Sequence, residues 1–258
     1  MSIKNASRDQ VRRHGRFDPS RGRVVPASTL CRRLAGALSI RRVNAMGRQP
    51  RLQVPGGLYH VTTRGNCRAS IFEDAFDRLA FLDRLGSSVV RFEWKCFAYC
   101  LMGNHFHLLI ETPDPNIARG MRALNGWYAQ RFNWRHERTG HLFEAPYHSE
   151  LVEREAHLLE ATRYIVLNPV RAKLCRLPDE WQWSSYRATA GFEPRTPWLS
   201  TGELLRVFSR RVGRAQARYR SFVEEAADPS FLAMSWDQVR RRVFGGPGSG
   251  PGPRTGLV

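Results

Sequence analysis

The sequence has few cysteines, few acidic residues and no long apolar run. Its five cysteines among 258 residues form no CxxC pair and no even set, which predicts reduced thiols in a cytoplasmic protein. No apolar run approaches the roughly 20 residues that cross a bilayer. No apolar segment follows the basic N-terminus, as it would in a signal peptide. These absences predict a protein with no membrane partner.

The shortage of acidic residues leaves the chain strongly basic. There are 23 Asp and Glu residues against 41 Lys and Arg, a net charge of +18. Residues 1–54 hold 13 basic and two acidic residues, or +11, and the remaining 204 residues still carry +7. A charge excess that persists outside the first segment is typical of proteins that bind a polyanion, most often nucleic acid.

Composition divides the chain into four segments. Residues 1–45 are rich in Arg, Ser and Gly with little periodicity, which predicts a disordered basic extension, and Met46 is a candidate for the true start. Residues 46–190 carry regular patterns and are expected to form the principal domain. Residues 191–244 predict a helical extension, and the Gly/Pro-rich residues 245–258 predict a flexible tail.

Strand-like and helix-like patterns alternate within the principal domain. Strands are expected at residues 57–65, 94–102, 105–112 and 147–152, with a tight turn at Gly103-Asn104. Helices are expected at residues 73–90, with Phe76, Leu79, Ala80, Leu82 and Leu85 on the apolar face, then at residues 114–136 and 154–168. This order predicts an α+β fold with a ferredoxin-like antiparallel sheet and helices on one face. The open face could then host a site and the last helix.

The stretch "AYCLMGNHFHLLIETP" carries His105 and His107 one residue apart. Because side chains alternate across a strand, both imidazoles share a face, while Phe106 points to the other side. Two adjacent imidazoles suit one divalent cation and leave open positions for a substrate oxygen. An isolated pair is more often two histidines on an exposed strand face, so a metal site needs a third ligand.

The last helix of the domain offers that ligand. Tyr164 and Asn168 are four residues apart and therefore lie on one helix face. The amide oxygen of Asn168 could complete a metal site, which would put the Tyr164 phenol beside a metal-bound phosphate. Two simpler interpretations stay open: Tyr164 as an interfacial tyrosine, and Asn168 as a helix cap before Pro169.

Five motifs lie between about Pro50 and Tyr186. They are "MGNHFHLLIETP" and "LLEATRYIVLNPVRAKL", together with "YHVTTRGN", "RFNWRHERTGHLF" and "WQWSSY". In these motifs the chain resembles the single-tyrosine HUH transposases, particularly the REP-associated tyrosine transposases of the insertion-sequence-200-like family. The resemblance implies that His105 and His107 are the metal pair, Asn168 a third metal ligand and Tyr164 the nucleophile.

The same resemblance implies the reaction and its partners. Members cleave single-stranded DNA at hairpin-associated sites, keep a 5′-phosphotyrosine and rejoin strands through the free 3′-hydroxyl. The expected cofactor is a divalent metal, Mg²⁺ or Mn²⁺, and the expected partner is single-stranded or hairpin DNA. Relatives also occur as dimers, so the resemblance allows a homodimer.

Single-stranded DNA binding needs cations for the phosphates and aromatic side chains for the bases. The residues expected to contact DNA are Arg64, Arg122, Arg131, Arg135, Arg138 and Arg171. After the "GHLF" segment many relatives carry a basic residue, whereas this chain reads "EAPYHSE". Glu144 and Pro146 therefore depart from the pattern of the relatives at one expected phosphate contact. Weaker candidates for the site are Tyr128, expected to pack in its helix, and the histidines His60, His141, His148 and His157.

Two other classes of function compete with the transposase. A decayed transposase would retain the basic surface and bind nucleic acid without forming a covalent adduct. A histidine-dependent phosphodiesterase or nucleotide hydrolase would use His105 and His107 without Tyr164. Leucine at position 109 argues against the hydrolases that use three alternating histidines.

Overall fold

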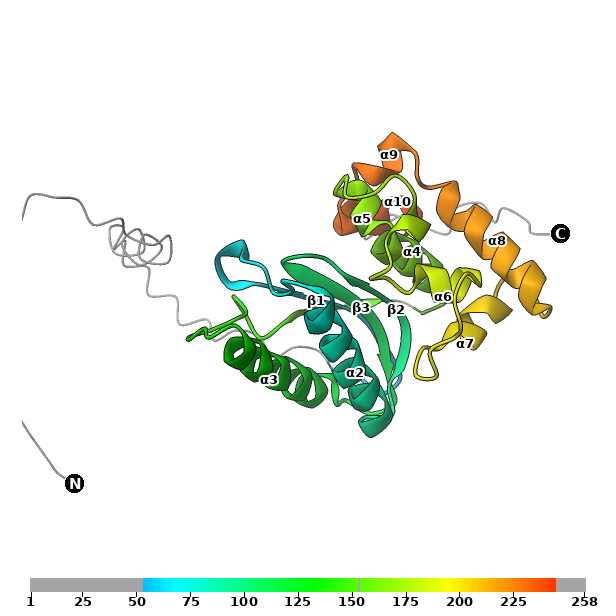
Figure 1. Cartoon of the computed structure of the whole chain (residues 1–258). Coiled ribbons are helices and arrows are strands. Elements are labelled where there is room, and N and C mark those ends of the chain that lie inside the picture. Colours follow the sequence, from blue (N-terminus) through cyan, green and yellow to red (C-terminus); the bar gives the residue numbers. More distant parts are fainter. Residues whose placement is uncertain (1–52, 153, 245–258) are drawn as a thin grey trace, which may run out of the picture. The chain divides into compact units, whose positions relative to one another are not determined.

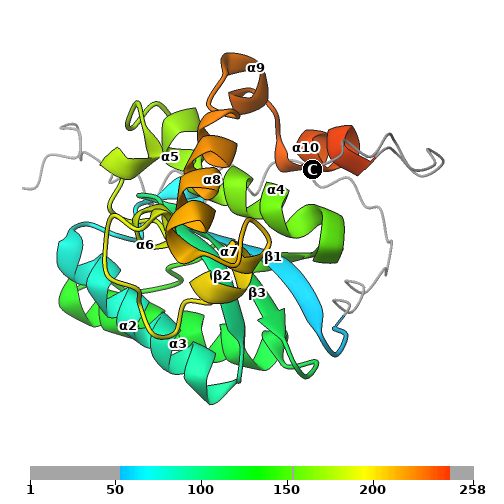
Figure 2. The same cartoon turned by 90° about the vertical axis from the view of Figure 1, so that its right-hand side faces the viewer.

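The computed structural model describes residues 53–152 and 154–244 of the chain. Three expectations lie outside the described residues: the basic extension over residues 1–45, the start at Met46 and the tail over residues 245–258. The described part is built around one sheet with helices on both of its faces (Figures 1 and 2).

Four strands form an antiparallel sheet in the order β2-β3-β1-β4. They are β1 (Gly57–Arg64), β2 (Lys95–Leu101), β3 (His105–Thr112) and β4 (His148–Val152). The expected turn joins β2 to β3, and the Met102 amide donates to the His105 carbonyl at 2.9 Å. Because β3 lies between β2 and β1, the order is that of the split βαβ motif. The predicted α+β, ferredoxin-like fold is confirmed.

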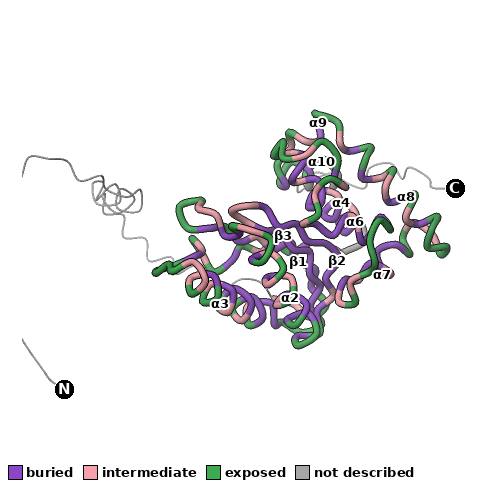
Figure 3. The backbone as a smooth tube through the Cα atoms, viewed as in Figure 1, coloured by how far each residue is buried: buried purple, intermediate pink, exposed green. Residues whose placement is uncertain are grey.

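Two helices cover the first face of the sheet, α2 (Ala75–Arg91) and α3 (Ile117–Arg135). Their apolar side chains share a core with the β3 residues that alternate with the histidines, among them Phe106. Most residues of β1, β2 and β3 and the inner faces of α2 and α3 are buried (Figure 3). The alternation in β3 therefore sends one set of side chains into this core and the histidines to the opposite face.

Helix α2 is confirmed, but its predicted apolar face is right only in part: Leu85 is buried, whereas the two residues nearest the start of the helix are not. Phe76 and Leu79 are 70% and 55% exposed, whereas Asp77 and Phe81 are buried. The reason is the Asp77 carboxylate, which lies 2.6 Å from Arg135 Nη1 in α3 and accepts a hydrogen bond from the Glu73 amide at 2.9 Å. A buried carboxylate must be paired, and this pairing turns the helix so that Asp77 faces α3.

Helix α4 (Arg154–Val166) packs on the second face of the sheet. Ala161 and Ile165 belong to an apolar cluster with Leu58 of β1 and Leu109 of β3. The chain stays helical beyond the expected stop: after Leu167, a short helix α5 (Asn168–Arg171) carries Pro169 in its first turn. Proline is tolerated there because first-turn amides have no partner within the helix.

A short helix, η1 (Asn66–Arg68), follows β1. The helices after α5 lie on the same side of the sheet as α4 (Figure 2). They are η2 (Pro178–Glu180), α6 (Tyr186–Ala190), α7 (Thr201–Arg206), α8 (Val212–Glu224), α9 (Pro229–Leu232) and α10 (Trp236–Phe244). Tyr219 of α8 and Trp236 of α10 join the apolar cluster that contains Ile165 of α4. None of the helices in the described ranges combines the length and apolar character that crossing a bilayer requires.

Candidate active site

The pairing of β1 with β3 determines which residues accompany the two histidines. Thr62 lies directly opposite His107, and Arg64 directly opposite His105. Residues opposite each other in an antiparallel pair share a face. His60 therefore lies on this face as well, diagonal to His107.

Both histidines have one ring nitrogen engaged and the other available. In His107, Nδ1 lies 3.0 Å from Nε2 of His60, and Nε2 is buried without a hydrogen-bond partner among the described residues. In the half-buried His105, Nδ1 lies 2.7 Å from Oδ1 of Asn104. The two rings are 5.1 Å apart between centroids. Metal-binding histidines commonly use one nitrogen for the metal and hold the other in this way.

Burial keeps the imidazoles of this face uncharged. It lowers the pKa of His105 to about 4, with a smaller contribution from the nearby Arg64 charge. It also lowers the pKa of His107 well below its ordinary value, and that of His60 to about 3. The three rings are therefore neutral at pH 7, the protonation state in which imidazole nitrogen binds a cation.

His60 was only a weaker candidate from the sequence, but the structure brings it into contact with His107. Its ring stacks on His107 with centroids 5.2 Å apart. The alternation of β1 places His60 and Arg64 on one face, but only the β1–β3 pairing shows that this face meets His107. A local pattern does not contain that information, because pairing register is set by contacts distant in sequence.

Helix α4 brings Tyr164 to the histidines. The Tyr164 ring lies edge-on to His107 and His60, with centroids 6.4 and 5.9 Å away. Trp236 packs against it at 5.3 Å, and Tyr164 is only 8% exposed. The Arg171 guanidinium lies 4.1 Å from the centre of its ring.

Asn168 lies one turn beyond Tyr164, and its side chain forms hydrogen bonds with backbone carbonyls of the preceding turn. Its Nδ2 donates to the carbonyl oxygens of Tyr164 at 3.0 Å and Ile165 at 3.3 Å. This is the capping role considered from the sequence, and it leaves the amide oxygen as the atom for a ligand. In the described residues, no group of three or more His, Cys, Asp or Glu side chains is arranged to hold a metal ion. A third protein ligand would therefore have to be of another type, such as the Asn168 amide.

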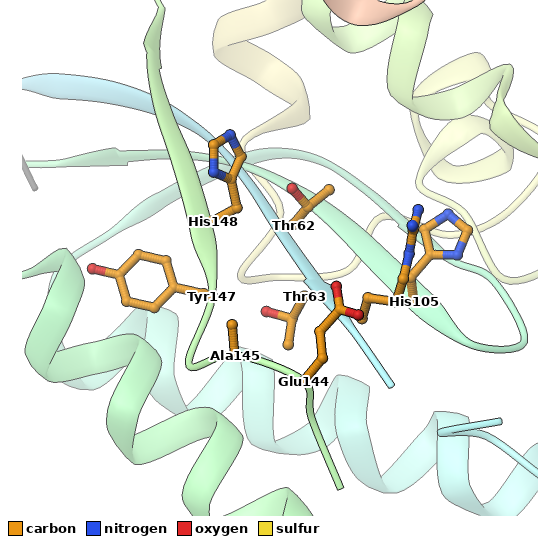
Figure 4. A pocket seen from close by; sticks show the side chains of 8 residues that line it. Thr62, Thr63, His105, Glu144, Ala145, Tyr147 and His148 are labelled. Atoms are coloured by element: carbon orange, nitrogen blue, oxygen red, sulfur yellow. The ribbon is translucent and has the colours of Figure 1, made fainter. Parts of the chain in front are cut away.

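A pocket of about 160 Å³ opens beside His105 (Figure 4). It is lined by Thr62, Thr63, Arg64, His105, Glu144, Ala145, Tyr147 and His148. Glu144, the departure from the family pattern, extends from the loop before β4 into the space beside Thr63 and His105 (Figure 4). His148, a weaker candidate from the sequence, also lines the pocket and forms an ion pair with Glu150 at 2.9 Å when protonated.

The six arginines expected to contact DNA fall into two groups. Arg64, at the pocket, and Arg171, beside Tyr164, accompany the histidines. The other four lie on or just after α3, which covers the opposite sheet face: Arg122, Arg131, Arg135 and Arg138.

The four arginines on the α3 side differ in how strongly they are held. Arg135 forms ion pairs with Asp74 and Asp77. Arg131 lies over the Trp127 ring and Arg138 over the Phe132 ring. Arg122 is exposed and forms no ion pair with any residue that the structure describes. Of the four, Arg122 is therefore the most accessible to a phosphate.

The structure also places the remaining candidates from the sequence. Tyr128 is buried in the core of the opposite sheet face, where its hydroxyl donates to the Ile71 carbonyl at 2.5 Å. Burial raises its pKa far above the ordinary value for tyrosine. His141 lines a groove beside α3, and His157 is buried in α4. Tyr128 is therefore not positioned to act with the histidines.

Comparisons with known proteins agree with the sequence motifs. Residues 53–168 match the profile of a family described as "Transposase IS200 like", and no curated protein matches significantly. A solved REP-associated tyrosine transposase bound to a REP hairpin is similar at 16% identity and a TM-score of 0.48, covering 58% of this chain and 89% of that one. A protein from Deinococcus radiodurans R1 assigned as a transposase is 22% identical with a TM-score of 0.33, covering 42% of this chain and 85% of that one.

Proposed function

Residues 53–168 match the family of IS200-like transposases, and on that premise we propose that this protein cleaves and rejoins single-stranded DNA at hairpin sites. Tyr164 would be the nucleophile, and His105, His107 and Asn168 would hold a divalent cation. All four residues lie within the segment that matches the family. The main support is the position of the Tyr164 ring beside His107, whose Nε2 is buried and unpartnered among the described residues.

The side chains fit a divalent metal through two neutral imidazoles and an amide oxygen. Mn²⁺ accepts imidazole ligands readily, whereas Mg²⁺ prefers oxygen, so Mn²⁺ should support activity at least as well as Mg²⁺. When bound, the cation would supply positive charge that orients a phosphate and withdraws electron density from it. Asn104 would hold the His105 ring at its Nδ1 atom, and His60 would hold the His107 ring at its Nδ1 atom.

In the proposed reaction, the Tyr164 oxygen attacks the scissile phosphorus. A bond forms between this oxygen and phosphorus, and the bond to the 3′-oxygen of the leaving strand breaks. The phenol loses its proton, the leaving oxygen gains one, and the 5′-phosphate remains on Tyr164. Attack by a 3′-hydroxyl reverses these steps and rejoins DNA without an external energy source, because the phosphotyrosine retains the bond energy.

Two arginines would assist at the reacting phosphate. A phenol is a weak nucleophile at pH 7, so positive charge beside the phosphate that it attacks would help the reaction. The Arg171 guanidinium lies over the Tyr164 ring, and its Nη1 is buried without a hydrogen-bond partner among the described residues. Arg64 is exposed opposite His105, where it could bind the next phosphate along the strand.

A covalent-adduct assay tests this proposal. Wild-type protein, Tyr164→Phe and the control Tyr128→Phe are incubated with labelled single-stranded hairpins taken from DNA flanking the gene, with Mn²⁺ or EDTA. We expect a band of protein-linked DNA on denaturing gels for wild type and Tyr128→Phe, dependent on Mn²⁺ and absent for Tyr164→Phe. Tight binding with no adduct across many hairpins would instead indicate a decayed transposase. An adduct that persists in Tyr164→Phe would show that the nucleophile is another residue.

A further inference from the structure

A groove of about 710 Å³ lies between helix α3 and the loop of residues 140–147. Its lining includes Arg122, Asn125 and Gly126 of α3. Glu144, Ala145 and Tyr147 line both this groove and the pocket at His105. The two cavities therefore adjoin across the loop that precedes β4, although the histidines and α3 lie on opposite faces of the sheet.

Asn125 provides an unsatisfied polar group at this groove. It is 6% exposed, and its Nδ2 donates to the carbonyl of Pro146 at 2.5 Å and to the Thr63 hydroxyl at 3.3 Å. Because a carbonyl can only accept, the bond to Pro146 fixes the orientation of the amide. Its Oδ1 is then buried with no partner among the described residues. A buried acceptor without a partner is costly, so a ligand with hydrogen-bond donors would satisfy it.

The helix face beside Asn125 leaves room for such a ligand. A Cβ added at Gly126 would meet no atom within 4 Å, and the neighbouring lining residues Ala118 and Ala129 are small. Gln130 and Arg122 are exposed at the groove. The lining therefore offers amide groups, which both donate and accept hydrogen bonds, together with a guanidinium. That combination matches the edges of nucleobases and a single phosphate.

We propose that this groove binds unpaired bases of the DNA strand that continues from the phosphate at Tyr164. This inference rests on the proposed function, which supplies the DNA strand. Asn125 accepts from a base amino or imino group, and Arg122 binds the adjoining phosphate. Glu144, at the junction of the two cavities, repels phosphates and favours the passage of bases past this point. A carboxylate can also accept from the amino group of cytosine.

Two pairs of variants test the groove. Gly126→Gln fills it, and Gly213→Gln is the matched control because Gly213 is also helical with no atom near its added Cβ. Arg122→Gln removes a charge at the groove, and Arg119→Gln removes the same charge elsewhere on α3, where Arg119 lies over the Phe92 ring. Glutamine is a better helix former than glycine, so neither glycine variant should lower thermal stability.

Binding is measured by fluorescence anisotropy in EDTA, with a hairpin carrying unpaired flanks and the same hairpin without them. We expect Gly126→Gln and Arg122→Gln to weaken binding of the flanked hairpin about tenfold, the effect of losing roughly one well-bound base. Both should bind the hairpin without flanks as wild type does, and both controls should bind both probes normally. Wild-type affinity of Gly126→Gln for the flanked hairpin would overturn the proposal. Equal weakening for both probes would also overturn it, because the groove would then not recognise unpaired bases.

The binding test and the adduct assay distinguish failure of the groove proposal from failure of the proposed function. If wild type forms the Tyr164 adduct and Gly126→Gln binds flanked DNA normally, the proposed function stands and the groove proposal fails. If no adduct forms with any hairpin but Gly126→Gln loses binding of flanked DNA, the groove stands as a DNA site and the proposed chemistry fails.

Discussion

At the scale of single residues, His60 determines how His107 is presented. Its Nε2 lies 3.0 Å from His107 Nδ1, so a His107 ring that binds metal through Nε2 would donate its Nδ1 proton to His60. Groups that hold a metal-binding histidine in this way typically change metal affinity by about 10- to 100-fold when they are removed. His60 is thus expected to be a positioning residue.

The corresponding prediction concerns metal affinity. His60→Ala should weaken Mn²⁺ binding by about 10- to 100-fold, measured without DNA by electron paramagnetic resonance of free Mn²⁺. His60→Gln, which keeps a hydrogen-bond acceptor, should recover part of the affinity. His148→Ala is the control, because His148 is exposed and pairs with Glu150. Unchanged Mn²⁺ affinity in a folded His60→Ala protein would show that His60 only fills the core.

The residue scale also shows what the sequence can and cannot provide. Alternation within one strand placed His105 and His107 on a common face, and helical spacing placed Tyr164 with Asn168, because both are local periodicities. The contact of His60 with His107 joins two residues that lie 47 positions apart on different strands. Such a contact becomes visible only when the pairing of β1 with β3 is known.

At the scale of secondary-structure elements, ion pairs hold α2 against α3. The Asp77 carboxylate lies 2.6 Å from Arg135 and 2.9 Å from His136. The side chain of Asp77 is only 3% exposed, so these contacts are shielded from solvent. The existence of both helices followed from apolar periodicity. The rotation of each helix about its axis did not follow from this periodicity. A charged residue such as Asp77 is expected to face solvent when only the sequence is known.

This network gives a prediction about stability. Asp77→Ala should lower the free energy of unfolding by about 2 kcal/mol, less than for a fully buried pair because Arg135 keeps Asp74 as a partner. Urea denaturation measures the change. Asp83→Ala, an exposed acid on the same helix, should stay within about 0.5 kcal/mol of wild type. Equal effects of the two substitutions would mean that the ion pairs contribute little.

At the scale of the whole molecule, the C-terminal helices enclose the proposed nucleophile. Arg171 donates from Nε to the Leu232 carbonyl at 3.1 Å and also donates to the Met234 carbonyl. Trp236 of α10 contacts both Tyr164 and His60, with ring centroids 5.3 Å away in each case. The sequence predicted helices in this region but not their position, because packing between distant segments leaves no periodic signal of its own.

The enclosure predicts how accessible Tyr164 is to small reagents. In wild-type protein, nitration by tetranitromethane should be slow at Tyr164, which is 8% exposed. Trp236→Ala removes the ring that covers it and should raise the nitration rate at Tyr164 severalfold, as quantified by mass spectrometry of peptides. Tyr186 and Tyr219, which are 1% and 0% exposed, are internal controls and should stay unmodified.

If the two control tyrosines are nitrated as well, the substitution has loosened the whole C-terminal core. An unchanged nitration rate at Tyr164 would show that Trp236 does not limit access. Selective nitration would mean that DNA reaches Tyr164 only after α10 moves, since a nucleotide is larger than tetranitromethane.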